Sequence, residues 1–168
     1  MSIDSVVHSF SYNLNFLRDQ VADVPEADMV AQPNGIRNHP AWVIGHLTYS
    51  CQAIGSELGL PSWLTQTWAQ QFGTGSVPAS TVPADSDDCK ANQLAALADA
   101  EGRIIDALLR MSDQQLDRPL PDEDFRKLLP TIRHAVTQIL VAHTAYHVGQ
   151  LTLWRNAMNL PVISRPFL

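Results

Sequence analysis

The sequence predicts an all-α protein, and three observations carry that prediction. Four stretches of the chain place apolar residues three and four positions apart, the spacing of a helix that buries one face. Connectors rich in Pro, Gly, Asn and Asp separate these stretches. No stretch alternates apolar and polar residues with the period of two typical of a half-buried strand. Helices of this length in a chain of 168 residues indicate a four-helix bundle that forms a single domain over residues 1–168.

The first two helices are expected in the first third of the chain. The first covers residues 2–22 and carries an apolar stripe of Val6, Val7, Phe10, Leu14, Leu17 and Val21. The second begins near Asn38 or His39, because Pro40 suits the first turn of a helix, where its missing N–H is not needed. It continues to a stop at Gly59.

The other two helices are expected in the second half of the chain. Residues 59–85 are interrupted by Pro and Gly and allow only a short helix over 62–71. The third main helix should start at Ser86 or Asp87 and carries Leu94, Leu97, Ile104, Ile105, Leu108 and Leu109. The fourth covers residues 131–159. The long connection between the second and third helices permits a crossover and a parallel pair.

Composition excludes several classes of function. The formal net charge is −6, and such an acidic surface repels phosphate backbones, which argues against nucleic-acid binding. The N-terminal segment lacks the features of a secretory signal, and no stretch is apolar enough to span a membrane. Cys51 and Cys89 are too few for a disulfide framework, so small, partly buried side chains in a reduced, cytoplasmic protein are expected.

Two histidines interrupt the apolar stripe of the fourth helix. His143 and His147 lie four residues apart, on one face and one turn apart, where both can bind a single metal ion. The apolar residues of that face are Val136, Leu140, Leu151, Trp154 and Met158. A neutral imidazole in a core needs a polar partner, and a metal ion would satisfy both rings at once.

A third ligand is expected from another helix, and His46 is the best candidate. It lies on the apolar face of the second helix, so it points toward the same core. His134 lies nine residues before His143 and therefore on the opposite face. His39 stands at the entrance of the second helix, as a distant alternative ligand or outer-sphere group, and His8 falls off the apolar stripe of its helix.

Other interpretations of these residues stay open at this point. Inward histidines can simply pack, and the glutamate of the HExxH zinc-protease motif is replaced by Thr144. Gln150 could hydrogen-bond a metal-bound water or the second nitrogen of a histidine, or make an ordinary bond between helices. Tyr146 and Trp42 could line a pocket or belong to the core.

Two further features have both a functional and an ordinary interpretation. Arg155 could bind a substrate carboxylate or form an ion pair between helices. The loop over residues 72–76 contains two glycines, as phosphate-binding loops do. It lacks their third glycine and their lysine, so a flexible loop is the expected structure.

The chain resembles the DinB-like (YfiT-like) superfamily of metalloproteins in two segments, NHPAWVIGHLTYS around His46 and HTAYHVGQLTLWRNAMNLP from His143. The resemblance implies a bundle in up-down-down-up order, often dimeric, that binds a divalent metal, in many cases nickel or zinc. It implies His46, His143 and His147 as the three ligands. One departure is that Asn159 stands where many members end the last helix with glycine; asparagine also adopts the left-handed conformation of a helix end.

Three neutral imidazoles leave the charge of a divalent ion in place and leave coordination positions open, as in catalytic sites. Such an ion lowers the pKa of a bound water toward about 7 or stabilises a thiolate. The sequence therefore predicts a metal-dependent hydrolase or a thiol-dependent S-transferase. Its partners would be a small-molecule substrate and a low-molecular-weight thiol. The alternatives are a non-catalytic protein that binds metal or a small ligand, such as a stress-response interaction module, and a plain helical bundle.

Overall fold

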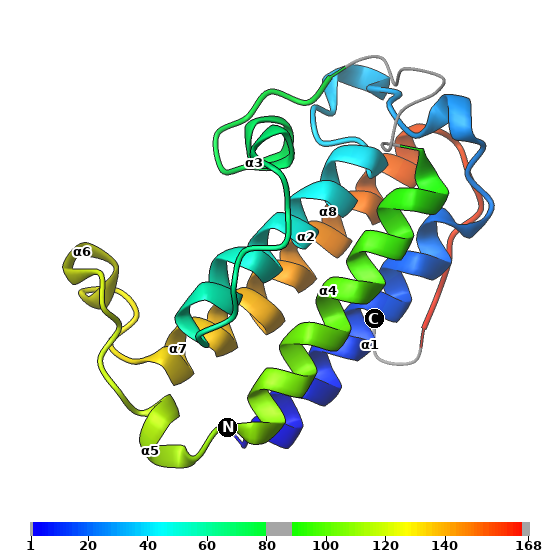
Figure 1. The fold of residues 1–168 in the computed structure, drawn as a ribbon. Helices are drawn as coiled ribbons and strands as arrows, with labels where there is room; N and C mark the ends of the chain where they lie inside the picture. Colours follow the sequence, from blue (N-terminus) through cyan, green and yellow to red (C-terminus); the bar gives the residue numbers. More distant parts are fainter. Residues whose placement is uncertain (1, 80–88, 166–168) are drawn as a thin grey trace.

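Four long helical segments carry the predicted apolar stripes, and they lie side by side in the computed structural model (Figure 1), which describes residues 2–79 and 89–165. They are α1 (Ile3–Ala22), α2 (Pro40–Glu57), α4 (Lys90–Arg110) and a continuous run of α7 (Ile132–Val136), η3 (Thr137–His143) and α8 (Thr144–Ala157). In the described residues the only strand-like pairing is an isolated bridge between Pro119 and Thr131. The all-α prediction is confirmed, whereas the up-down-down-up order of helix directions stays a prediction.

Short elements connect the long segments. They are η1 (Glu26–Asp28), η2 (Pro33–Gly35), α3 (Gln66–Phe72), α5 (Asp113–Leu116) and α6 (Glu123–Arg126). Of these, α3 packs against α2, and α5 packs against α7. In Figure 1, α3 and α6 lie on the same side of the long helices, one toward each end. Two connectors expected to be irregular therefore contain helical turns.

The ends of the helices follow local chemistry that the sequence shows. The Ser2 hydroxyl caps α1 by accepting the Ser5 N–H at 3.2 Å. Pro40 occupies the first turn of α2, and Gly59 follows the end of α2 with φ +85°, as expected of a helix stop. Asn159 follows α8 with φ +57°, so it does replace the usual glycine there.

Three predictions about the helices need correction. α4 begins at Lys90 with Cys89 as its N-cap, and the expected caps Ser86 and Asp87 lie outside the described residues. The short helix expected over 62–71 starts only at Gln66, because the Thr65 side chain accepts the Trp68 N–H and caps it there.

The third correction concerns the fourth helix. The region expected to be one α-helix over 131–159 contains a π-helical stretch, η3.

The core lies between the long segments and is formed mainly by the predicted stripes. Its members from α1 and α4 include Val6, Phe10, Leu14, Leu17, Val21, Leu97, Ile104 and Leu108, all nearly inaccessible to solvent. Leu109 was expected on the buried face of α4 but is 64% exposed, because it lies one position beyond the buried Leu108. Among the described residues, no helix is both long and apolar enough to cross a membrane.

Candidate metal centre

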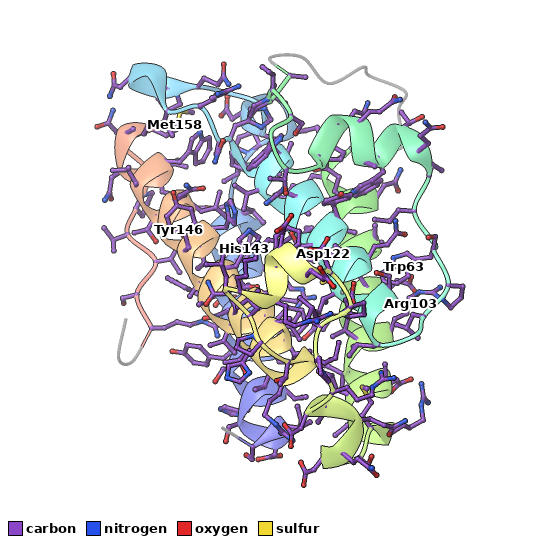
Figure 2. All side chains as sticks on the ribbon, turned by 90° about the vertical axis from the view of Figure 1, so that its left-hand side faces the viewer. Trp63, Arg103, Asp122, His143, Tyr146 and Met158 are labelled. Carbon is purple, nitrogen blue, oxygen red and sulfur yellow. The ribbon has the colours of Figure 1, made fainter. Side chains whose placement is uncertain are left out.

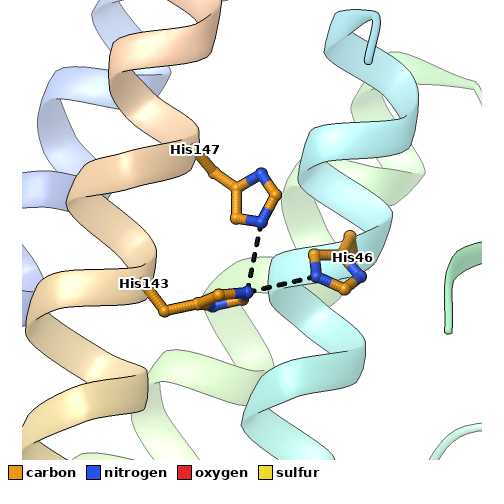
Figure 3. Close-up of side chains that lie close together, drawn as sticks. All are labelled: His46, His143 and His147. Carbon is orange, nitrogen blue, oxygen red and sulfur yellow. Dashed lines mark hydrogen bonds between the residues drawn. The ribbon is translucent and has the colours of Figure 1, made fainter. Parts of the chain in front are cut away.

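The structure brings His46, His143 and His147 together between two of the long segments (Figure 3). His46 comes from the middle of α2, His143 from the end of η3, and His147 from the start of α8. Nε2 of His143 lies 3.2 Å from Nε2 of His46 and 3.1 Å from Nε2 of His147. The spatial cluster predicted from the sequence is therefore present.

The outer nitrogen of His46 fixes the protonation state of that ring. Nδ1 of His46 lies 2.7 Å from the carbonyl oxygen of Phe72, a contact that only a protonated Nδ1 can make as donor. A neutral ring that donates through Nδ1 keeps a free lone pair on Nε2. His46 is thus oriented with an electron-pair donor facing the other two rings.

His147 is held in the same way by a side chain. Its Nδ1 donates to Oε1 of Gln150 at 2.9 Å, and Asn38 donates to the same oxygen at 3.1 Å. Gln150 therefore contacts the second nitrogen of a histidine, which is one of the roles expected for it from the sequence. Asn38, which sequence reasoning missed, holds the Gln150 amide with its oxygen toward the ring.

Three Nε2 atoms at these separations cannot satisfy one another by hydrogen bonds alone. Nε2 of His46 and of His147 both present lone pairs, and a single N–H on His143 can donate to only one of them. A tetrahedral ion with bonds of 2.0–2.1 Å would place ligand nitrogens about 3.3 Å apart. The two separations from His143 are close to that value, and the donor atoms of all three rings lie within 4.8 Å of one another, so the cluster can hold a divalent ion.

Burial keeps the three rings in the neutral form that binds metal. Burial, followed by repulsion from the neighbouring histidines, lowers the pKa of His143 and of His147 to about 4. Burial also lowers the pKa of His46, against the opposing effect of the Phe72 carbonyl. All three imidazoles are therefore unprotonated at neutral pH.

The loop that follows α3 closes one side of the site. Trp42 stacks on the His46 ring with centroids 4.5 Å apart and donates its indole N–H to Ser76 at 2.9 Å. Phe72 packs directly on Gly45, where any Cβ would overlap the Phe72 ring. The loop expected over 72–76 thus borders the site, and Trp42 belongs to the core at 6% exposure.

The opposite side is more open. His143 is only half-buried, and Tyr146 is 64% exposed with its ring against the edge of His147. Figure 2 shows both labelled residues on the same helical run. Tyr146 therefore lies outside the core, beside the histidines, where it can contact a molecule that approaches them.

The π-helical stretch shifts the backbone immediately before the site. Thr144, the first residue of α8, donates its hydroxyl to the Ile139 carbonyl of η3 at 3.2 Å, and the Asn13 side chain of α1 donates to the Val141 carbonyl of η3 at 3.2 Å. Polar side chains thus add hydrogen bonds to two carbonyls of the wider turn, and such turns are frequent at functional sites. The sequence stripe gives no sign of this turn, because its residues keep the ordinary spacing.

The remaining candidate residues lie elsewhere. His39 is buried, but its Nδ1 accepts the Trp42 N–H at the start of α2 and its Nε2 donates to the Ala79 carbonyl. His134 and His8 are exposed, as expected from their positions on their helices.

Two other side chains have ordinary roles. Arg155 forms an ion pair with Asp23 and is 2% exposed, which is the interhelical alternative of the sequence analysis. Cys51 is buried, which raises its pKa to about 12 and leaves it an unreactive thiol.

A shallow groove of about 440 Å³ lies on the outer side of the Gln150–Asn38 pair. Its other lining residues are Ile36, Arg37 and Leu153. The groove thus combines apolar walls, a guanidinium group and the amide that holds His147. It offers a surface of mixed polarity next to the cluster.

Comparison with known proteins agrees with the resemblance seen in the sequence. The family model of the DinB superfamily matches residues 12–151, a region that includes all three clustered histidines and Gln150. No individual curated protein matches the chain significantly, and no solved structure does. Because the family model covers most of the chain, the protein belongs to the DinB superfamily.

Proposed function

We propose that the protein binds one divalent metal ion, nickel or zinc, through Nε2 of His46, His143 and His147, in a bundle of up-down-down-up order. The observation that carries the proposal is the convergence of three Nε2 atoms while the outer nitrogens of two rings are engaged by Phe72 and Gln150. Buried histidines that only packed would not need to direct their lone pairs at one point.

We further propose that the metal site is catalytic and acts on a small molecule, as a thiol-dependent S-transferase. When bound, the ion would supply a thiolate or hydroxide nucleophile at neutral pH. In the described part of the chain, the groups that hydrogen-bond or stack on the three rings include no carboxylate. A thiol needs less help from a separate base than water does, because its pKa is already near 8.5. Transfer of a thiol is therefore favoured over hydrolysis, which remains the second candidate.

Two regions beside the histidines could accept the two substrates of this reaction. The open side at His143 and Tyr146 would admit the thiol, and the groove beside Gln150 would accept part of the second substrate. Under this proposal a low-molecular-weight thiol and a small electrophile are the partners, and the protein works as a cytoplasmic homodimer. A closed site with Tyr146 folded over the histidines would instead favour a non-catalytic metal-binding or stress-response role.

The metal content of protein purified without a histidine tag tests the binding site. We expect about one equivalent of divalent metal per chain, and a value well below one equivalent after His147→Ala. His134→Ala is the matched control, because His134 lies on the same helical run but is exposed. A metal content that stays near zero in the unaltered protein would refute the proposed site.

A screen of low-molecular-weight thiols with electrophilic substrates tests the reaction. We expect turnover that depends on added thiol and on metal and is lost in His147→Ala. Turnover no higher than that of His147→Ala for every thiol would overturn the transferase proposal while leaving metal binding intact.

A further inference from the structure

The three histidines differ in how their outer nitrogens are held. Nδ1 of His46 donates to a backbone carbonyl and Nδ1 of His147 to the Gln150 side chain. Nδ1 of His143 is buried and has no hydrogen-bond partner in the part of the chain that the structure describes. Rings fixed at both nitrogens resist rotation, whereas His143 would be fixed by a metal ion alone.

The packing and burial of the three histidines also distinguish His143 from the other two. The His46 ring lies almost parallel to Trp42, at an interplanar angle of 9°. His46 and His147 are 5% and 4% exposed, respectively. His143 is only half-buried, so it is the one of the three residues that is partly accessible to solvent. In Figure 3, dashed lines join Nε2 of His143 to each of the other two rings.

The backbone also differs at His143. His143 is the last residue of the π-helical stretch, whereas His46 and His147 lie within regular α-helices. Two carbonyls of that stretch, those of Ile139 and Val141, accept hydrogen bonds from the side chains of Thr144 and Asn13. His143 is thus the one ligand that ends a π turn, although its own backbone angles are helical, with φ −66° and ψ −41°.

From these three differences, and resting on the proposed metal site, we infer that His46 and His147 are permanent ligands and that His143 is the exchangeable ligand. A soft anionic donor such as a thiolate replaces it. While Nε2 of His143 binds metal, its Nδ1 must carry a proton that no neighbour accepts. Release of the His143 ring would free Nε2 and let both of its nitrogens hydrogen-bond to water. The thiolate sulfur would take its place as a ligand, and the proton of the thiol would pass to solvent.

The zinc affinities of single variants test whether His143 contributes less to metal binding than His46 and His147 do. Protein stripped of metal is titrated with Zn²⁺ against a chromophoric chelator. We expect His143→Ala to bind Zn²⁺ at least about tenfold more tightly than His46→Ala or His147→Ala. His134→Ala should match the unaltered protein. An equal loss of affinity in all three variants overturns the inference and leaves the metal site standing, whereas absence of zinc binding by the unaltered protein refutes both.

Nitrogen NMR of the zinc-loaded protein, with histidine labelled by ¹⁵N, tests the exchange itself. On addition of 2-mercaptoethanol, we expect one Nε2 signal to move to the position of a free imidazole. That signal should be the one missing from the spectrum of His143→Ala. In Gln150→Leu, His147 loses its anchor, so release should be shared between His143 and His147. If all three rings stay bound, or if His46 or His147 leaves first, the inference is wrong.

Discussion

At the scale of single residues, Gln150 decides how well His147 is prepared to bind metal. Its oxygen accepts hydrogen bonds from both His147 and Asn38. Such outer contacts fix the orientation and the protonation of a ligand before the ion arrives. The expected loss from Gln150→Leu is therefore one of metal affinity rather than of folding.

We predict that Gln150→Leu weakens zinc binding by about 10- to 100-fold, the range for loss of a hydrogen bond that orients a ligand. A competition titration with a chelator measures this. Gln138→Leu is the matched control, because Gln138 is an exposed glutamine of the same helical run. If both variants bind zinc like the unaltered protein, Gln150 has no orienting role.

A second prediction at this scale concerns Gly45, the residue before His46. A methyl group there would overlap the Phe72 ring, whose backbone carbonyl holds His46. Gly45→Ala should lower the free energy of unfolding by about 1–3 kcal/mol, the usual cost of overpacking. Gly102→Ala in α4 has open space around it and should raise stability by about 0.5–1 kcal/mol. Urea denaturation distinguishes the two, and equal effects would contradict the packing argument.

At the scale of elements, the π-helical stretch η3 is the least expected feature of the site. Its position between α7 and α8 determines where His143 stands relative to His147. Because Thr144 and Asn13 supply hydrogen bonds to its carbonyls, the stretch depends on contacts within the folded protein. Replacing Thr144 or Asn13 by a residue whose side chain cannot donate a hydrogen bond should therefore destabilise η3.

We predict that Thr144→Val lowers the free energy of unfolding by about 1 kcal/mol, the net value of one hydrogen bond. Thr137→Val is the control, since no hydrogen bond is seen for its side chain among the described residues. Thermal or urea unfolding measures both. A loss that is as large for Thr137→Val would show that the hydrogen bond to Ile139 is not what matters.

The apolar stripes were enough to predict the long helices and which of their faces are buried. They also placed His46, His143 and His147 inward, because the spacing of a helix assigns every residue to a face. The π turn could not be predicted, since the stripe keeps its ordinary spacing and one of the turn's hydrogen bonds comes from Asn13, more than a hundred positions away in the chain. The Phe72 carbonyl gives no sequence signal either, because any residue carries one.

At the scale of the whole molecule, the buried histidines link stability to pH. In the metal-free protein the pKa of His143 and of His147 is about 4, against an ordinary value of 6.5. Burial also lowers the pKa of His46 and of His39. Between these values the unfolded chain binds more protons than the folded one, so stability rises with pH across that window.

We therefore predict that protein stripped of metal loses stability as the pH falls from about 6.5 to about 4 and changes little above pH 7. Urea midpoints at pH 5 and pH 7.5 measure the effect. His147→Leu should show a smaller difference between the two midpoints, because one titrating group is gone. Equal midpoints for the unaltered protein at both pH values would contradict the effect of burial.

The most direct test of the central claim is anomalous X-ray diffraction from crystals of tag-free protein soaked in zinc. We predict one strong peak per chain, about 2.0–2.1 Å from Nε2 of His46, His143 and His147. The account would be contradicted if no anomalous peak lay beside these three histidines and zinc bound instead at exposed histidines such as His8 or His134.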